Sequence, residues 1–318
     1  MKLRTFDWKN QRVLCVENMG SWLVVNQLPG CNDLPNDMLE VLDQWPIIKP
    51  KISDALGLAT NARLPDTAKP VAPFQPRSLR DFMLSERHAV NAARGFVKHF
   101  VTKAQPVVRG YERITGKVFP PLKPKPIWYR EPVYYFSNHL NVAYDGAEIK
   151  WPGYTRFLDY ELELAWVITK PLFNATSEQA QAAIGGFMLL NDFSARDLQL
   201  QEMRSGFGPQ KSKHFVNGLS YTIVTADDVL PFINQLKAEV CINGNQVCNT
   251  STADMRHTVI DVLLHASKDE QLHPGEVFAT GTLPNGCAME NDHWLKPGDE
   301  IELKIERVGS LSHIIAAQ

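Results

Sequence analysis

Acidic residues at alternating positions are the sharpest chemical feature of this sequence, in the run Asp159-Tyr160-Glu161-Leu162-Glu163-Leu164. Residues two apart on a β-strand point to the same face, so Glu161 and Glu163 are predicted to project side by side, with Asp159 at the start of that face. Like charges this close, beside the apolar run 164–168, are costly unless a cation neutralises them. One interpretation is a site for a hard divalent ion, which prefers oxygen ligands. The other is an exposed acidic edge strand that blunts aggregation.

Two further groups of polar residues could take part in the same chemistry. Asp192 follows Asn191 at the end of an apolar run, where an unpaired buried carboxylate would be unfavourable. It could bind a cation, or it could cap a helix over 195–201. Asp81 is followed seven residues later by His88. The chain has nine histidines, so the residue type alone does not distinguish a catalytic histidine from a packed or surface one.

The composition excludes several classes of protein. The chain has 318 residues, 44% hydrophobic and 21% charged, with a formal net charge of -2, which excludes collagen-like and strongly disordered chains. A near-neutral balance without a basic stripe predicts no nucleic-acid partner. No apolar run approaches the roughly 18–20 residues that span a bilayer, so we expect no membrane partner. The first eight residues lack the apolar core of a signal peptide, and the expected location is therefore cytoplasmic.

Residues 1–70 are predicted to form a small N-terminal domain, and residues 71–318 a larger catalytic one. The leading part has short strand candidates at 12–16 and 22–25 and a helical pattern at 37–45. A stretch with four prolines at positions 65–76 follows and indicates an extended connection, because proline continues neither a helix nor a central strand.

The larger part predicts many short strands and few helices. The second half of 81–100 and the segment 257–266 have helical periodicity, and 177–190 indicates a helix that runs into a buried strand, with Ser177 as its N-cap. Residues 106–132 are rich in proline, which favours loops and strand edges. The strand candidates are 161–168, 221–225, 238–242, 246–248, 277–280 and 301–305. This pattern predicts a β-rich α+β fold, a mixed β-sandwich roll, rather than a doubly wound sheet.

Taken together, these pieces resemble the fumarylacetoacetate hydrolase superfamily over roughly residues 76–306. Their order and spacing both agree with the family pattern, and the combination is more specific than any single piece. The first 70 residues match only the loose pattern of the family's variable leading domain. The matching segments are Asp81–Asn91, Leu158–Glu163, Asn191–Gln199, Gly281-Thr282, Glu290 and Lys296–Glu300.

The resemblance implies a role for each group of matching residues. The four implied metal ligands, for Mg²⁺, Ca²⁺ or Mn²⁺, are Asp81, Glu161, Glu163 and Asp192. His88 looks like the family's water-activating base, with Glu290 orienting its imidazole. The groups that look like stabilisers of developing negative charge are Arg196, Gln199 and one lysine of Lys211-Ser212-Lys213, for which the register favours Lys213. The implied substrate contacts are Tyr135, Gly281 and Thr282.

The sequence departs from the family pattern at two positions that would contact the substrate. Fumarylacetoacetate hydrolase has a tyrosine and an arginine for the substrate carboxylate where this chain has Met83 and Val97. An apolar pair cannot bind a carboxylate through charge-assisted hydrogen bonds, which favours a less charged acyl group. The residues Val216-Asn217 also replace the Gly-Thr usually found after the active lysine.

The function that the resemblance implies is metal-dependent hydrolysis of a carbon–carbon bond in a small 1,3-diketo acid, such as an acylpyruvate or a fumarylacetoacetate-like compound. The alternative is an isomerase, hydratase or decarboxylase of a 2-oxo acid that uses the same metal–enolate site. A third interpretation is a non-enzymatic scaffold whose carboxylates bind a structural metal. Because the superfamily commonly dimerises, we expect a homodimer.

Overall fold

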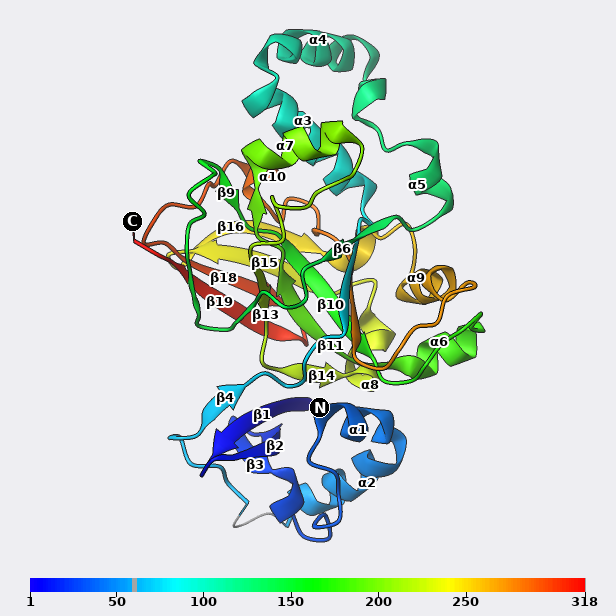
Figure 1. Cartoon of the computed structure of the whole chain (residues 1–318), viewed down its shortest axis with the longest axis vertical. Coiled ribbons are helices and arrows are strands. Elements are labelled where there is room, and N and C mark those ends of the chain that lie inside the picture. The colour runs from blue at the N-terminus through cyan, green and yellow to red at the C-terminus, as the bar shows by residue number, and fades with distance from the viewer. Residues whose placement is uncertain (59–61, 318) are drawn as a thin grey trace.

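Strands dominate the computed structural model, which describes residues 1–58 and 62–317 (Figure 1). The largest sheet is a twelve-stranded mixed sheet with the central order β3-β2-β1-β14-β11-β10-β17-β5-β6, to which β4, β7 and β13 are attached. Its strands are β1 (Lys2–Trp8), β2 (Gln11–Asn18), β3 (Ser21–Val24), β4 (Lys69–Val71), β5 (Ser78–Phe82), β6 (Tyr134–Ser137), β7 (Val142–Tyr144), β10 (Leu162–Ile168), β11 (Ile184–Asn191), β13 (Asn217–Leu219), β14 (Ile223–Thr225) and β17 (Glu276–Ala279).

A second sheet of five strands shares an apolar core with the central strands of the first. Its strands are β16 (Asn245–Ser251), β15 (Lys237–Ile242), β18 (Glu300–Ile305), β19 (Gly309–Ile315) and β8 (Glu148–Ile149). The shared core contains Leu164 and Trp166 of β10 together with Val240 and Leu303 of the five-stranded sheet. A short pair, β9 (Leu158–Asp159) with β12 (Ser194–Ala195), lies beside them. The β-rich α+β sandwich predicted from the sequence is therefore confirmed.

In the described part of the chain, ten α-helices connect and cover these sheets. They are α1 (Met38–Asp43), α2 (Trp45–Leu56), α3 (Glu86–Phe100), α4 (Gln105–Thr115), α5 (Pro126–Arg130), α6 (Ser177–Ala183), α7 (Arg196–Ser205), α8 (Ala226–Val229), α9 (Val259–Ala266) and α10 (Ala288–Asn291). Figure 1 shows α3, α7 and α10 grouped at one end of the central strands, with the leading elements at the opposite end.

Two local predictions about helices were wrong. Residues 106–132 contain α4 and α5 rather than loops and strand edges, because prolines stand in the first turn of both helices, where a missing N–H has no cost. The helix at α6 is capped by Thr176, not by Ser177, through a reciprocal pair of hydrogen bonds with Gln179.

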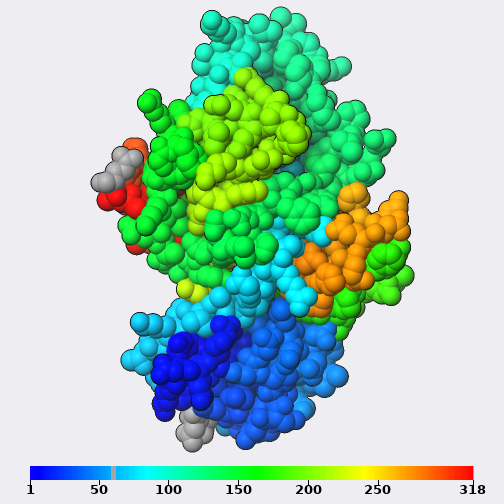
Figure 2. All heavy atoms as spheres, in the orientation of Figure 1, coloured from blue at the N-terminus to red at the C-terminus, as the bar shows by residue number. Residues whose placement is uncertain are grey.

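The leading region packs on the opposite face of the large sheet from the sandwich core. Ala165 and Val167 of β10 belong to a cluster that also contains Val41 of α1 and Ile48 of α2. In Figure 2 the leading residues form a rounded mass at the lower end of the molecule. The boundary at residue 70 stays a prediction. No helix in the described part of the chain is long and apolar enough to cross a membrane.

The directions of the strands bring the ends of five segments together at one edge of the large sheet, where edge means the line formed by the strand ends. β5 and β17 run parallel, whereas β10 is antiparallel to both β17 and β11. The start of β10 therefore lies at the same edge as the ends of β5, β11 and β17. β6 reaches this edge as well, since Tyr135 is paired with Asp81. Polar residues from distant parts of the chain can therefore meet at this edge.

Candidate functional site

Three buried carboxylates meet at this edge of the sheet. Asp81 comes from the end of β5, Glu163 from the start of β10, and Asp192 from the residue after β11. One oxygen of each lies within 4.8 Å of the others, and the three side chains are almost completely buried. Asp192 does not cap α7, which begins after Ala195 without any side-chain cap, so the alternative interpretation of Asp192 was wrong.

Most oxygens of this carboxylate group have no hydrogen-bond donor among the described residues. Asp81 Oδ1, Asp192 Oδ1 and both Glu163 oxygens are buried and unpaired. Burial, together with the charge of neighbouring carboxylates, raises the pKa of Asp81 and of Glu163 well above its usual range. Buried acceptors without donors are costly, and a hard divalent cation with oxygen ligands satisfies them all at once. The donor set therefore fits a divalent metal.

The fourth predicted ligand, Glu161, has a different environment. Its two oxygens form ion pairs with Arg196, at 2.6 Å, and with Lys213. Burial alone would raise the pKa of Glu161, but the charges of Arg196 and Lys213 outweigh burial and lower it. Lys213 also forms an ion pair with Asp192 and thus connects Glu161 to the carboxylate group. The structure therefore brings Glu161 beside the group rather than into it.

The lysine left open between two positions is distinguished by its surroundings. Lys213 is buried against Glu161 and Asp192, whereas Lys211 is exposed and lies over the ring of Tyr154 at 5.4 Å. Burial would lower the pKa of Lys213, but the negative charges of Asp192 and Glu161 raise it. Lys213 is therefore a fixed cation within the site.

His88 and Glu290 form a close pair, and His88 lies close enough to Glu161, beside the carboxylate group, for its charge to act on it. His88 Nδ1 lies 2.5 Å from Glu290 Oε1, and both side chains are buried. The other Glu290 oxygen accepts a hydrogen bond from the backbone N–H of Asn285 at 2.9 Å. Cys287 Sγ lies 3.6 Å from Glu290 Oε1. The carboxylate is fixed in place, and the imidazole is held by one nitrogen, which leaves Nε2 as the nitrogen that can accept a proton.

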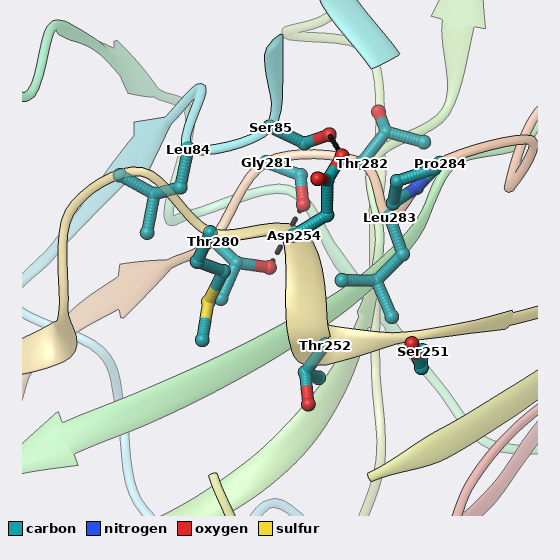
Figure 3. Close-up of a pocket in the computed structure, with 11 residues that line it drawn as sticks. Leu84, Ser85, Ser251, Thr252, Asp254, Thr280, Gly281, Thr282, Leu283 and Pro284 are labelled. Carbon is teal, nitrogen blue, oxygen red and sulfur yellow. Dashed lines mark hydrogen bonds between the residues drawn. The ribbon is translucent and has the colours of Figure 1, made fainter. Parts of the chain in front are cut away.

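The helix that carries His88 is fastened at its first turn. Ser85 Oγ caps α3 by accepting from the backbone N–H of His88 at 3.1 Å, and it donates to Asp254 Oδ2 at 3.0 Å. Figure 3 shows Ser85 and Asp254 in contact, with Thr280 and Gly281 close by. Thr280 accepts a backbone hydrogen bond from Leu84 at 3.0 Å. The start of α3 is thereby tied to the segment after β17.

The predicted turn at Gly281-Thr282 closes over the end of β5. Gly281 has a φ of +74°, and a Cβ at this position would lie 2.2 Å from the carbonyl oxygen of Phe82 and 2.9 Å from Cα of Met83. Only glycine fits such a close approach with a left-handed backbone. Met83 is 37% exposed beside this turn, and Thr282 is buried.

The remaining predicted contacts divide into near and distant residues. Tyr135 donates to Asp192 Oδ2 at 2.7 Å, and Arg196 donates to Gln199 Oε1 at 2.9 Å, so these residues adjoin the site. Val97 lies nine residues beyond His88 on α3, which is about 14 Å along the helix and on its opposite side. The structure therefore does not bring Val97 to the carboxylate group.

Sequence reasoning missed the contacts of two contributors to the site, and its placement of Asp159 on the face of Glu161 and Glu163 was wrong. The side chain of Asn191 accepts from the backbone N–H of Glu161 at 3.0 Å and so fixes the start of β10. Asp159 is bonded to Arg196 at 2.7 Å instead of joining the face of Glu161 and Glu163. Both residues stand inside the matched segments, but spacing alone does not reveal which donors they contact.

Comparison with known proteins places these features in a family. Residues 107–316 match the family model described as fumarylacetoacetate (FAA) hydrolase C-terminal. The chain is 26% identical over 304 residues to the fumarylacetoacetate hydrolase domain-containing protein 2 homolog of Dictyostelium discoideum, covering 91% of this chain and 88% of that protein. It is 30% identical over 185 residues to the mitochondrial oxaloacetate tautomerase fahd2 of Xenopus laevis, covering 58% of each. The chain thus spans little more than half of that tautomerase.

Solved structures share the whole fold. A fumarylacetoacetate hydrolase from Exiguobacterium antarcticum superposes with a TM-score of 0.70 at 23% identity, over 100% of both chains. Maleylpyruvate hydrolase from Sphingobium sp. SYK-6, in complex with manganese(II) and pyruvate, gives 0.68 at 19% identity, also over 100% of both chains. With the family model covering about two thirds of its length, this chain belongs to the fumarylacetoacetate hydrolase family, whose members include hydrolases, isomerases and tautomerases.

Proposed function

We propose that this protein is a divalent-cation-dependent enzyme that cleaves a carbon–carbon bond in a 1,3-diketo acid such as an acylpyruvate. The observation that carries the proposal is a group of three buried, donor-poor carboxylates that Lys213 connects to Glu161, on which the charge of a histidine held by a glutamate acts. A structural ion site needs no general base beside it. A buried histidine–glutamate pair such as His88–Glu290 is not required for packing a core. Together the two features are typical of a site that activates water next to a bound oxyacid.

Asp81, Glu163 and Asp192 would hold the cation, with Glu161 beside them. When bound, a divalent cation supplies Lewis-acid polarisation of the substrate's carbonyl and carboxylate oxygens. Mg²⁺, Ca²⁺ and Mn²⁺ all suit a set of oxygen ligands. The maleylpyruvate hydrolase of similar fold, solved with manganese(II) and pyruvate, supports Mn²⁺ as the first ion to test.

The residues of the chain supply the proton transfers. His88 Nε2 takes a proton from water while Glu290 stabilises the imidazolium that forms. The hydroxide adds to the distal carbonyl carbon, and the new oxyanion is stabilised by the buried cations and amide of Lys213, Arg196 and Gln199. Collapse then breaks the carbon–carbon bond, and its electron pair moves onto the pyruvate-side carbon as an enolate. The proton held by His88 returns to that carbon, which yields two acids.

Met83 supports a substrate with an uncharged acyl end. It stands where fumarylacetoacetate hydrolase has a tyrosine for the substrate carboxylate; its backbone lies against Gly281, and the residue is partly exposed. A thioether offers no hydrogen-bond donor to a carboxylate. We therefore place short acylpyruvates ahead of fumarylacetoacetate in a substrate panel.

A second candidate is tautomerisation of a 2-oxo acid. It is favoured by the 30% identity to an oxaloacetate tautomerase, although this covers only 58% of each chain. Tautomerisation needs proton transfer at the carbon between two carbonyl groups, which His88 could perform without any attack by water. The same residues would then serve a reaction in which no carbon–carbon bond breaks.

Product analysis in ¹⁸O-labelled water separates the two candidates. We expect Mn²⁺-dependent cleavage of acylpyruvates, with one ¹⁸O atom incorporated into the released acid and loss of activity in a chelator. Interconversion of keto and enol oxaloacetate without any cleaved product would instead establish the tautomerase. If neither reaction occurs with Mn²⁺, Mg²⁺ or Ca²⁺, the proposed function is wrong.

His88→Ala tests the role of the proposed base. We expect turnover to fall by about 100- to 10,000-fold, the usual contribution of a general base, while Mn²⁺ still binds. His99→Ala is the matched control, because His99 lies eleven residues beyond His88 on the same helix, about 16 Å along it, and is bonded to Asp292 at 2.8 Å rather than to Glu290. Full activity in His88→Ala would remove His88 from the mechanism.

A further inference from the structure

Asp159 connects the carboxylate group of the site with the His88–Glu290 pair. It is completely buried at the end of β9 and accepts hydrogen bonds from several elements at once. Its Oδ1 accepts from the backbone N–H of Ala288 at 2.7 Å and of its neighbour Tyr160 at 2.8 Å. Its Oδ2 accepts from Arg196 Nε at 2.7 Å and from the backbone N–H of Met289 at 3.0 Å. Both of its oxygens are therefore fully engaged.

One side of Asp159 leads to the carboxylates. The guanidinium that donates Nε to Asp159 also contacts Glu161 Oε1 through NH2 at 2.6 Å. Its third nitrogen, NH1, donates to Gln199 at 2.9 Å. Because the guanidinium is planar and rigid, fixing Nε on Asp159 also fixes the positions of Glu161 and Gln199.

The other side of Asp159 leads to the base. Ala288 and Met289 are the first two residues of α10, and Glu290 follows them directly. The position of these two amides therefore determines where Glu290 meets His88. α3 crosses this helix so closely that a Cβ on Gly95 would lie 2.0 Å from the carbonyl oxygen of Met289. Such a tight crossing leaves no room for α10 to shift while the pair with His88 stays intact.

We propose that Asp159 is a positioning residue that sets the geometry of the His88–Glu290 pair relative to the carboxylates that would hold the cation. The proposal rests on the proposed function for its kinetic consequence, but its structural consequence can be measured in the metal-free protein. Asparagine is the smallest test, since its NH2 group would face either Arg196 or a backbone N–H, and two donors cannot share one hydrogen bond.

The first experiment observes the His88–Glu290 hydrogen bond directly in the metal-free protein. A proton held between Nδ1 and Oε1 at 2.5 Å is expected to give a low-field ¹H resonance, which is assigned by its absence in Glu290→Gln. We expect Asp159→Asn to shift or abolish this resonance. The control is Asp197→Asn, because Asp197 has a similar set of donors, Thr155 Oγ1 at 2.5 Å and the N–H groups of Arg156 and Leu198, but contacts neither α10 nor Glu161.

The second experiment separates positioning from stability. For Asp159→Asn we expect kcat to fall by about 100-fold, the cost of a misplacement near 1 Å, with KM changed far less. Asp159→Glu retains the charge for Arg196 but moves the carboxylate by one methylene, and we expect it not to restore kcat. A resonance and a kcat equal to those of Asp197→Asn in both variants would overturn the proposal.

Hydrogen exchange in the unmodified protein completes the test and needs no variant to fold. We expect the amides of Ala288 and Met289 to exchange as slowly as those of β10, because Asp159 holds them. Fast exchange at both amides would overturn the proposal. If the unmodified chain shows slow exchange and the low-field resonance but turns over no 2-oxo acid, the positioning role stands and only the proposed function fails.

Discussion

The neighbours Arg80 and Asp81 on β5 point to opposite faces of the sheet and meet opposite electrostatic surroundings. Arg80 donates to Glu276 at 3.1 Å, to Glu270 at 2.6 Å and to Tyr134 at 2.9 Å, so its charge is balanced within the protein. Asp81 faces two other carboxylates, and its Oδ1 has no donor among the described residues. A completed ion network serves stability, whereas an incomplete one is suited to binding a ligand of the missing charge.

The largest expected effect falls on the balanced face. Arg80→Met leaves the buried carboxylate of Glu276 without its guanidinium, and we expect a loss of about 3–5 kcal/mol in the free energy of unfolding. Urea denaturation measures it. Mn²⁺ affinity of the folded variant should be unchanged, and a loss of affinity as large as that of a ligand variant would break the distinction between the two faces.

Glu163→Gln tests the unbalanced face. It removes one charge and one ligand oxygen from the carboxylate group, and we expect Mn²⁺ affinity by calorimetry to fall by at least about 100-fold, which exceeds the usual effect of an outer contact. Glu276→Gln is the matched control, because Glu276 is an equally buried glutamate whose partner is Arg80. Equal effects in the two variants would show that burial, not a cation site, explains the group.

Adding the cation should stabilise the protein through the same face. At a free Mn²⁺ concentration of 100 times Kd, linkage predicts about 2.7 kcal/mol of added stability. A rise in Tm with Mn²⁺ that is absent in Glu163→Gln would sharpen the comparison. If Glu163→Gln and the unmodified chain respond alike, the ion acts elsewhere.

A buried base without any counter-charge gives the smallest expected effect. His313 is fully buried behind Phe193, and burial lowers its pKa to about 4 from the ordinary 6.5. As the pH falls, the imidazole of His313 is protonated in the unfolded chain before it is protonated in the folded one. The contribution of neutral His313 to the free energy of unfolding is therefore present above about pH 6.5 and is lost as the pH falls toward 4. Between pH 6.5 and 5 we expect a loss of about 1.6 kcal/mol in the free energy of unfolding. In His313→Gln this part of the pH dependence of unfolding should disappear, and an unchanged slope would contradict it.

The sequence was informative where chemistry depends on local spacing. Alternation along β10 predicted that Glu163 and Leu164 face opposite sides, and the structure places Leu164 in the sandwich core and Glu163 in the carboxylate group. Asp81 and Asp192 were implied by the resemblance to the family and not by spacing alone, and the structure brings both to Glu163. The fold class followed from the number and length of the apolar segments.

The hydrogen-bond and ion-pair partners of the site's side chains could not be predicted, because they depend on tertiary packing. Nothing in the spacing shows that Glu161 binds Arg196 and Lys213, or that Asp159 caps α10. The prolines of α4 and α5 were misleading, since proline disfavours a helix interior yet is well suited to a first turn. Telling these cases apart needs the flanking geometry, which a linear pattern does not contain.

The assembly of the site from the edge of one sheet has a kinetic consequence. Glu163 and Asp192 meet when β10 pairs with β11, but Asp81 approaches them only after β5 and β17 have docked on β10, which we expect to be a late event in a fold rich in non-local pairings. An ion that needs oxygens from all three side chains is expected to bind the transition state for folding only weakly, because its ligands are not yet assembled there. Its stabilising effect should therefore appear as slower unfolding, with the refolding rate nearly unchanged.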